Sequence, residues 1–461
     1  MGGGDASAAW HVHADSRADS GLRGAFGANK VDRFNLASSF RFGANSELDV
    51  RIGSLDINAG HGTAEGGDPN NPPRMRQMGS SYVQLDWSRV LDADNDLNIS
   101  ASHTENVFRD AFKYVDATSI FNGIMVDFAG NELNDSLTVQ WTGRQSAQLR
   151  TVAGVEVRNE RVVAPSVLEG RGSVDSSFQR LFFNTEWRPH EAVAFNAGAM
   201  AEESSIAGSS VSPRAMVNWH LVPGHTVRYG VSSAFRPPSP FEKYGKITYV
   251  DLTGAFRLPY LNNSGTLKPE QILVRELGYN FLIPACSFSG DVRAFDEHVT
   301  DGIRLGSTSL PGYTVNGDAF RVTGLEWQAQ WKPGNDTHIF FSQTWAQVDV
   351  ERSAYPKKTF TMEHSVAKYA VSLAVLQRLA NNWDLGLTYS RAEDIAVMGL
   401  DDRRWTFNLD RVDLRLAKGF KLGRNSAEWA LVAQNLGGPI RDGDQKFSLD
   451  PRAFMSLRVD F

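Results

Sequence analysis

The sequence predicts an all-β fold, a transmembrane antiparallel β-barrel of about 20–22 strands. Three observations predict it: segments of about ten residues in which apolar and polar residues alternate, connections that are alternately short and long, and a composition without a break. The chain has 461 residues, 41% of them hydrophobic, and its 41 glycines and its aromatic residues (11%) are spread along the whole length. As soluble folds, this length would make roughly three domains of about 150 residues each. No shift in composition marks two or three separate cores.

The alternating segments are typical of long strands. In residues 225–235 the apolar Val227 and Tyr229 alternate with small or polar residues, and residues 383–390 and 453–461 repeat the pattern. A period of two residues indicates strands with one apolar face. Strands of a β-sandwich have about five or six residues, whereas a strand that crosses a membrane needs about 9–11. The longer segments favour a barrel whose apolar face meets lipid and whose polar face lines a wet lumen.

The connections alternate in length, as they do in outer-membrane barrels. The short ones contain the turn-forming residues Pro, Gly, Asn and Asp. They are residues 43–45, 91–94, 188–190, 222–224, 283–285, 332–335, 380–382 and 422–425. The long ones are residues 61–78, 109–131, 161–175, 236–267, 305–315, 352–363, 394–404 and 437–449, of which 109–131 has room for a further strand pair. Tryptophans beside the short turns favour an aromatic girdle at the membrane surface over the core of a soluble hairpin; they are Trp187, Trp219, Trp331 and Trp383.

Charge and cysteine content exclude several other classes of protein. The net charge of −6 gives no support to nucleic-acid binding, which needs a basic face. The single Cys286 excludes an internal disulfide framework and a cysteine metal cluster. A membrane-spanning helix is not expected, because no run of about 18 apolar residues is present. Residues 1–5 lack the basic and apolar regions of a signal peptide.

A set of ordered motifs in residues 233–280 resembles one protein family. Residues 233–245 read SAFRPPSPFEKYG and residues 267–280 read LKPEQILVRELGYN. These segments are similar to those of TonB-dependent outer-membrane receptors, whose barrels carry Arg-x-Pro-x-x-x-Glu, then Leu-x-Pro-Glu and Glu-x-Gly. The matching residues are Arg236, Pro238, Glu242, Leu267, Pro269, Glu270, Glu276 and Gly278. Phe461, which ends an alternating strand, is similar to the signal that the outer-membrane assembly machinery reads.

The resemblance implies a monomeric receptor in the bacterial outer membrane, in contact with lipopolysaccharide, that takes up a ferric siderophore or similar metal chelate with energy from TonB. Members of the family begin with a signal peptide, a TonB-contacting box and a plug domain, and residues 1–461 show none of these. We therefore expect residues 1–16 to be an N-terminal remnant or linker and residues 17–461 to be the barrel. The chain is then a truncated product, a barrel fragment or half of a split receptor. A plugless passive outer-membrane channel is the alternative function.

Candidate ligand-binding residues are cations and aromatic side chains in the long connections, which suit an anionic or aromatic chelate. They are Arg74, Arg76, Tyr114, Phe241, Tyr244, Tyr249, Lys357, Lys358, Arg403, Arg404 and Trp405. The alternatives for these residues are contact with lipopolysaccharide and plain solvation. Haem is disfavoured, because the haem receptors of this family have a histidine between two boxes and residues 236–270 contain none.

Neither a metal site nor a cofactor is predicted. His11 and His13 share one strand face at a spacing that could bind a metal, but two surface histidines explain them as well. The paired carboxylates Asp401 and Asp402, and Asp442 and Asp444, fit solvated loop charges better than catalysis. An enzyme carried by the barrel is therefore disfavoured.

Overall fold

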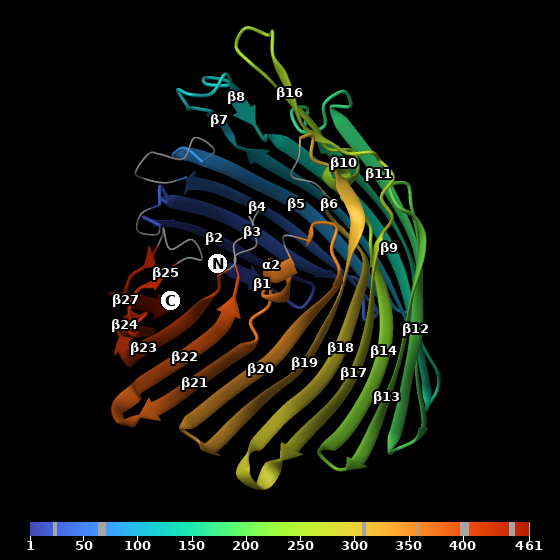
Figure 1. Ribbon diagram of the computed structural model, residues 1–461. Coiled ribbons are helices and arrows are strands. Elements are labelled where there is room, and N and C mark those ends of the chain that lie inside the picture. The colour runs from blue at the N-terminus through green and yellow to red at the C-terminus, as the bar shows by residue number, and fades with distance from the viewer. Residues whose placement is uncertain are drawn as a thin grey trace.

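The computed structural model describes residues 1–21, 25–62, 71–306, 310–356, 359–396, 405–441 and 448–460. Its main element is one antiparallel sheet of 21 strands, in which each strand pairs with its neighbours along the chain. Figure 1 shows this sheet curving around a wide interior. The predicted all-β, barrel-type architecture of about 20–22 strands is confirmed by this sheet.

The sheet consists of the short β1 and twenty longer strands, joined as an up-and-down meander. They are β1 (Gly2–Gly4), β2 (Ala8–Asp19), β3 (Asn29–Arg41), β4 (Ser46–His61), β5 (Arg74–Val90), β6 (Asn95–Arg109), β9 (Gly130–Ser146), β10 (Leu149–Val163), β11 (Ser173–His190), β12 (Val193–Ser204), β13 (Gly208–Val222), β14 (His225–Arg236), β17 (Glu270–Ile283), β18 (Phe288–Leu305), β19 (Thr314–Gly334), β20 (Thr337–Arg352), β21 (Tyr369–Leu379), β22 (Trp383–Ile395), β23 (Phe407–Leu422), β24 (Asn425–Gln434) and β27 (Arg452–Asp460).

The remaining elements are small and lie in the connections. They are the hairpins β7 (Ala111–Lys113) with β8 (Met125–Asp127), β15 (Lys246–Val250) with β16 (Arg257–Asn262) and β25 (Ile440–Arg441) with β26 (Ser448–Leu449), the helices α1 (Pro240–Tyr244) and α2 (Thr359–Glu363), and the single turns η1 (Pro284–Cys286) and η3 (Ala380–Asn382). In the described part of the chain, none of the helices has the length and apolar character that crossing a membrane requires.

The two faces of the sheet follow the alternation of the sequence. In the β11–β12 ladder, Leu181 lies opposite Ala201 on the outer face, and Leu181 is 62% exposed. One residue earlier, Arg180 lies opposite Glu202 on the inner face and forms an ion pair with it. Because apolar side chains point outwards along most strands, the described residues form no single buried core. A small buried cluster of Ala164, Leu168 and Val174 lies instead in the connection after β10.

Tight turns join the strands at one end of the sheet, here called the short-turn end, where the sequence predicts them. Residues 223–224 link β13 to β14, with Gly224 at a φ of 84°, a backbone conformation that favours glycine. Cys286 is exposed in η1, between β17 and β18. At the same end Trp187 is 48% and Trp219 is 56% exposed on the outer face. Such exposure fits an aromatic girdle and does not fit the buried core of a soluble hairpin.

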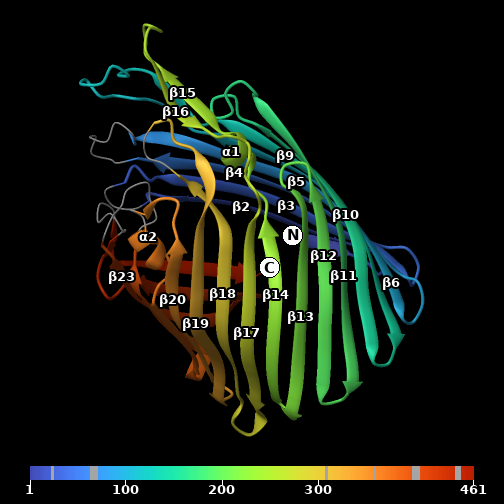
Figure 2. The ribbon, with the colours of Figure 1, turned by 45° about the vertical axis from the view of Figure 1, so that its right-hand side comes forward.

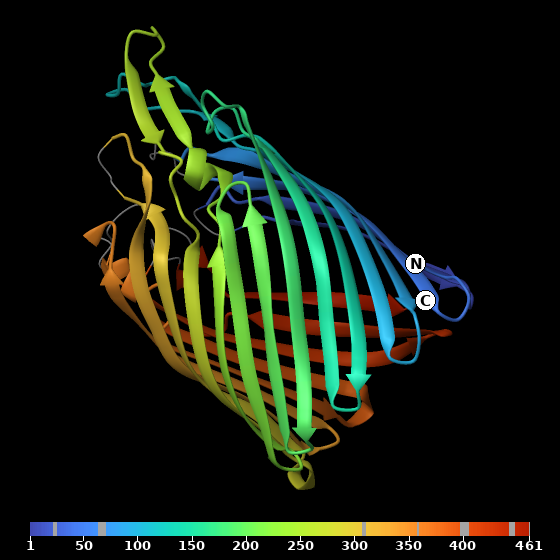
Figure 3. The same cartoon turned by 90° about the vertical axis from the view of Figure 1, so that its right-hand side faces the viewer.

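The opposite end, here called the long-loop end, carries the longer connections and their hairpins. Residues 109–131 contain the β7–β8 hairpin, which pairs separately from the main sheet. The β15–β16 hairpin stands beside it, and the two project together beyond the main sheet in Figures 1 and 3. Figure 2 shows α1 at the base of the β15–β16 hairpin. Two tight turns that contain neither Pro nor Gly are not evident from the sequence pattern: residues 205–207 at this end and residues 147–148 at the short-turn end.

The two ends of the sheet differ from the expected closed barrel. Residues 8–16 form one strand with residues 17–19 and pair with β3, so the first long strand begins at Ala8 rather than at residue 17. Along the described residues, β27 pairs with β24 and β1 pairs with β2, but no ladder joins β27 to β1 or β2. The sheet therefore has two free edges and the barrel is not closed.

Candidate functional site

Two rows of inward-facing residues cross β4 to β10 near the long-loop end, and they are unlike the rest of the inner face. The first row runs from Leu55 through Ser80, Asn106 and Glu132 to Val162. The second row runs from Ile57 through Met78 and Phe108 to Gly130. Both rows lie on the lumen side because their positions alternate with the outward-facing residues of each strand. The apolar members of these rows (Leu55, Ile57, Met78, Phe108 and Val162) are here called the apolar wall.

At the same height the outer face is charged. His103 and Asp135 pair across β6 and β9 at 2.6 Å, and both side chains are more than half exposed. Arg161 and Asp175 face each other across β10 and β11 at 3.7 Å. Nearer the short turns the same outer positions are apolar, for example Leu137 in β9. The polarity of the two faces is thus exchanged between the middle of these strands and their long-loop ends.

The apolar wall forms one side of a cavity of about 620 Å³. Ser239, Pro240 and Phe241, at the start of α1, form the other side, and Phe241 is 44% exposed. Concave sites with mostly apolar walls and a few polar groups are typical of ligand pockets. Of the predicted ligand-binding residues that the structure describes, Phe241 is the one that lines this cavity.

Helix α1 is held in place by three charged residues of the predicted motifs. Arg236 donates to both carboxylate oxygens of Glu242, at 2.9 and 3.0 Å, and also pairs with Glu270. Ser239 caps the helix by accepting a hydrogen bond from the Glu242 amide, and Glu242 accepts one from the Ser239 amide in return. Burial raises the pKa of Glu242, but Arg236 and the Ser239 amide outweigh it and hold that pKa below its usual value.

The remaining motif residues also have structural positions. Pro238 and Leu267 are buried in the connection that carries α1. Glu276 accepts from Arg293 at 2.8 Å on the inner wall. A Cβ atom at Gly278 would lie 2.6 Å from Nε of Arg228, so glycine leaves room for that side chain. Pro269 directly precedes β17.

The other end of α1 packs against the loop after β10. The ring of Tyr244 contacts the buried cluster around Leu168, and the guanidinium of Arg171 lies 4.3 Å from the centre of that ring. Lys243 donates to the backbone carbonyl of Ile206. Tyr244, although predicted as a ligand contact, therefore anchors α1 to the rim.

Arg74 and Arg76 both pair with the carboxylate of Asp110, whose side chain is 1% exposed. Arg74 also stacks over Phe112, with its guanidinium carbon 4.3 Å from the ring centre. Burial acts to raise the pKa of Asp110, but the two arginines outweigh it and hold that pKa below its ordinary value. The charges of these two arginines are directed at Asp110 and not into the cavity.

The predicted aromatic residues of the hairpins lie farther from the wall. Tyr114 donates to Asp116 at 3.3 Å after β7, and Tyr249 packs against Tyr260 within the β15–β16 hairpin, with ring centres 5.4 Å apart. Burial, and to a smaller extent Tyr260, raises the pKa of Tyr249. The two hairpins touch through the rings of Phe121 and Phe256, whose centres are 5.7 Å apart.

Of the remaining predicted ligand contacts the structure describes Trp405, which does not line the cavity. Trp405 packs beside Phe407 at the start of β23, with ring centres 6.4 Å apart. Predictions on Lys357, Lys358, Arg403, Arg404 and Phe461, and on the carboxylates of residues 401–402 and 442–444, fall outside the described residues. His13 on the inner face of β2 hydrogen-bonds Asp15 at 3.0 Å, and in the part of the chain that the structure describes no three His, Cys, Asp or Glu side chains gather as metal ligands.

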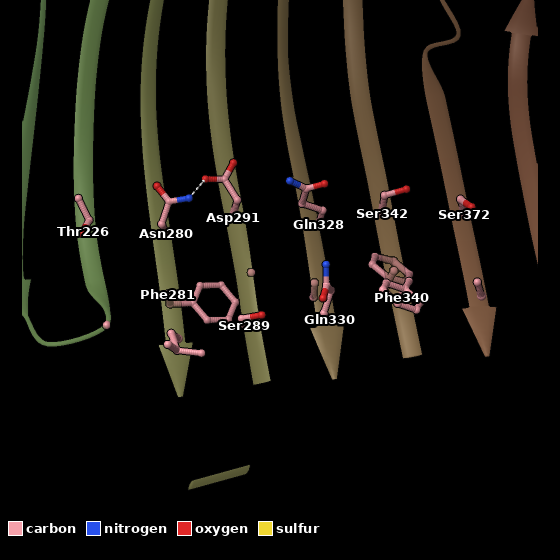
Figure 4. Close-up of a pocket in the computed structure, with 16 residues that line it drawn as sticks. Thr226, Asn280, Phe281, Ser289, Asp291, Gln328, Gln330, Phe340, Ser342 and Ser372 are labelled. Atoms are coloured by element: carbon pink, nitrogen blue, oxygen red, sulfur yellow. Dashed lines mark hydrogen bonds between the residues drawn. The ribbon is translucent and has the colours of Figure 1, made fainter. Parts of the chain in front are cut away.

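A second cavity, of about 590 Å³, lies on the inner wall near the short-turn end. Figure 4 shows that six of its polar side chains lie opposite one another from strand to strand and form a row. The row consists of Thr226, Asn280, Asp291, Gln328, Ser342 and Ser372 in β14, β17, β18, β19, β20 and β21, and is here called the polar row. Above it, Arg228 pairs with Asp291 at 2.7 Å, and Arg293 bridges Glu276 and Glu326. This is the hydrated inner surface that the sequence pattern predicts.

Comparison with known proteins identifies the family that has this architecture. The sequence pattern of the family described as "TonB dependent receptor-like, beta-barrel" matches residues 7–436. No curated protein sequence matches the chain.

Solved structures with the same fold include three receptors or transporters. The ferric enterobactin receptor PfeA from Pseudomonas aeruginosa has 12% identity and a TM-score of 0.75, covering 98% of this chain and 75% of its own. The siderophore receptor PirA from Acinetobacter baumannii has 13% identity and a TM-score of 0.74, covering 98% and 75%. The iron transporter FrpB from Neisseria meningitidis has 11% identity and a TM-score of 0.74, covering 99% and 77%. At these identities the likeness shows a common fold.

Proposed function

Because the chain belongs to the family of TonB-dependent receptor-like β-barrels, we propose that it is the barrel of an outer-membrane receptor that takes up a ferric siderophore or a similar metal chelate. The single observation that carries the proposal is the family match over residues 7–436. The solved structures named as siderophore receptors support the ligand class, since they share the fold along nearly the whole chain. An exposed apolar outer face beside a polar inner row supports a place in the bilayer.

The cavity at the long-loop end is the proposed binding site. It opens between strands of the wall and a helix that is fixed by Arg236, Glu242 and Glu270. A rigid helix presents Phe241 to the ligand without first being ordered, which lowers the cost of binding. Lys357, Lys358, Arg403, Arg404 and Trp405 remain proposed contacts to an anionic chelate. We further propose that TonB supplies the energy for uptake through a plug domain, and that Phe461 guides assembly in the outer membrane. We also propose that the barrel contacts lipopolysaccharide and acts as a monomer.

The test is binding of ⁵⁵Fe-labelled chelates to the chain purified in lipid nanodiscs. A trihydroxamate, a triscatecholate and ferric citrate represent the three main ligand chemistries. We expect saturable binding of at least one of them, weakened by Phe241→Ala. Leu252→Ala, at a 72% exposed hairpin residue away from the cavity, is the control. Absence of saturable binding of all three chelates would contradict the proposal.

A passive outer-membrane channel is the second candidate, and the polar row favours it. Side chains such as Gln328 and Ser342 line the inner wall across six neighbouring strands, which is the surface a hydrated passage needs. Single-molecule conductance in planar bilayers distinguishes the two functions. A large steady conductance without chelate binding supports the channel, and chelate binding supports the receptor.

A further inference from the structure

The apolar wall stands where the sequence pattern calls for water-facing side chains. Elsewhere the inner face carries polar rows and ion pairs, such as Arg180 between Glu156 and Glu202. Leu55, Ile57 and Met78 are instead partly exposed on the inner face. Contiguous apolar surface left open to water marks a place where another molecule binds.

The charges around the wall restrict what that molecule presents to it. Within the described chain, Glu132 is the one ionisable residue among those that line the cavity. It accepts a hydrogen bond from Asn106 at 3.2 Å. Cations near the cavity are engaged by other groups: Arg74 and Arg76 pair with Asp110, and Arg236 pairs with Glu242 and Glu270. Arg109, beside Phe108, donates to the backbone carbonyls of Phe108 and Gly130 and to the side chain of Asn131. The described residues that line the cavity offer a carboxylate and no cation, so the cavity disfavours the charged part of a chelate.

The shape and residue types point to an aliphatic group. Four of the five side chains of the apolar wall, Leu55, Ile57, Met78 and Val162, are branched aliphatic or thioether chains. Phe108 lies in the wall and Phe241 on α1, so a flexible chain between them contacts apolar atoms on both sides. Resting on the proposed function, we propose that the chelate carries an aliphatic acyl chain and that the apolar wall, closed by Phe241, binds it.

The two sides of the cavity are already in place before such an acyl chain binds. Helix α1 is only five residues long, yet both of its ends are fixed, by Arg236 at the start and by Tyr244 against Leu168 at the end. The wall belongs to continuous ladders of the main sheet. Neither side has to be ordered when the acyl chain enters, so the gain from burying methylene groups is retained.

The experiment compares gallium(III) trihydroxamates that differ in one N-acyl group: acetyl, hexanoyl or benzoyl. Affinity is measured by isothermal titration in nanodiscs of one lipid composition, and the ¹³C-methyl signals of Met78 and Met75 are followed by NMR. Met75 lies on the outer face of the same strand and is 48% exposed, so Met75→Gln is the matched control for Met78→Gln. Gallium replaces ferric iron because it is diamagnetic.

We expect the hexanoyl compound to bind at least about tenfold more tightly than the acetyl compound, which corresponds to burial of about two methylene groups. Its binding should shift the Met78 signal and leave the Met75 signal in place. Met78→Gln combined with Ile57→Asn should reduce the preference to less than about threefold, whereas Met75→Gln should retain it.

Equal affinity for the acetyl and hexanoyl compounds, or an unchanged preference in the Met78→Gln, Ile57→Asn variant, would overturn the inference. A benzoyl compound that binds more tightly than the hexanoyl compound would also overturn it, in favour of an aromatic group. If none of the three compounds binds, the inference fails. The panel of unmodified chelates still decides the proposed function independently.

Discussion

The polar row and the apolar wall are both built from inward-facing side chains of neighbouring strands, but they differ in polarity and in their height along the barrel. The polar row lies across six strands, and in the apolar wall Ile57, Met78 and Phe108 lie opposite one another across β4, β5 and β6. The polar row, near the short turns, has apolar residues on the outer face behind it. The apolar wall, near the long loops, has charged pairs such as His103 with Asp135 behind it. The comparison teaches that strand alternation determines which side a residue faces, whereas height along the barrel determines what that side contacts.

The largest effect is expected from replacing Asp110, which supports the rim of the barrel above the apolar wall. Asp110→Ala leaves Arg74 and Arg76 without their shared carboxylate, next to the end of the wall at Phe108. Loss of one partner from a buried ion pair costs about 3–5 kcal/mol. We expect faster hydrogen exchange in the β7–β8 hairpin and weaker binding at the cavity, with the polar row unaffected. Equal exchange in wild type and variant would show that the rim does not depend on this carboxylate.

The second prediction compares a charge placed at two heights along the outer face of β11. Leu181→Arg places a charge on the outer face of β11, where the side chain is 62% exposed. A charge there costs about 2–4 kcal/mol if the position lies near the middle of the bilayer, and about 0–1 kcal/mol near its surface. Gln179→Arg, two residues nearer the long loops on the same face, is the matched control. Urea unfolding in lipid vesicles measures both, and equal destabilisation would contradict the assignment of heights.

A smaller effect is expected at the start of α1. Ser239→Ala removes the side-chain cap on the Glu242 amide. Loss of such a cap costs about 1 kcal/mol. We expect weaker binding of the chelate at the apolar wall and unchanged unfolding of the main sheet. Ser239→Asp, which retains a capping oxygen, should restore binding, and its failure would assign the loss to another cause.

The smallest effect at neutral pH concerns the titration of Asp110. Its pKa in the folded state is held below the ordinary aspartate value by Arg74 and Arg76. A lowered pKa stabilises the fold above the unfolded value of about 3.9, and this contribution is lost as pH falls through the folded value. Hydrogen exchange of the β7–β8 hairpin should therefore be constant from about pH 7 to 5 and accelerate below about pH 4, after correction for intrinsic rates. Asp110→Asn should abolish this dependence.

The parts of the fold that follow from local sequence were predictable. Alternation in residues 225–235 identifies β14 and β13 pairs with it across a turn that contains Pro223 and Gly224. The turn at residues 147–148 contains no residue with a strong turn preference, so only the ladder of β9 with β10 reveals it. The local sequence pattern also misplaced the start of the first long strand. Residues 8–16 belong to β2, and their pairing with β3 reveals it.

The candidate site was predictable in part. Arg236, Glu242 and Glu270 stand out in the sequence, but their contact with one another is tertiary and fixes α1. Arg74 and Arg76 looked like free cations because their partner, Asp110, is 34–36 residues away in the chain. A change of phase was the sequence signal for the apolar wall: Leu48, Val50 and Ile52 alternate on one face of β4, whereas Leu55 and Ile57 fall on the other. The unbroken register of β4 with β5 shows that Leu55 and Ile57 face inwards.

The exposed thiol in the turn between β17 and β18 makes the chain a chemically asymmetric object. Cys286 is the one cysteine of the sequence, and it lies at the short-turn end, opposite the hairpins. A maleimide too large to cross a membrane can modify only those molecules whose short turns face it. The fraction labelled, counted on intact vesicles and again after they are opened, therefore measures how the protein is oriented across a bilayer.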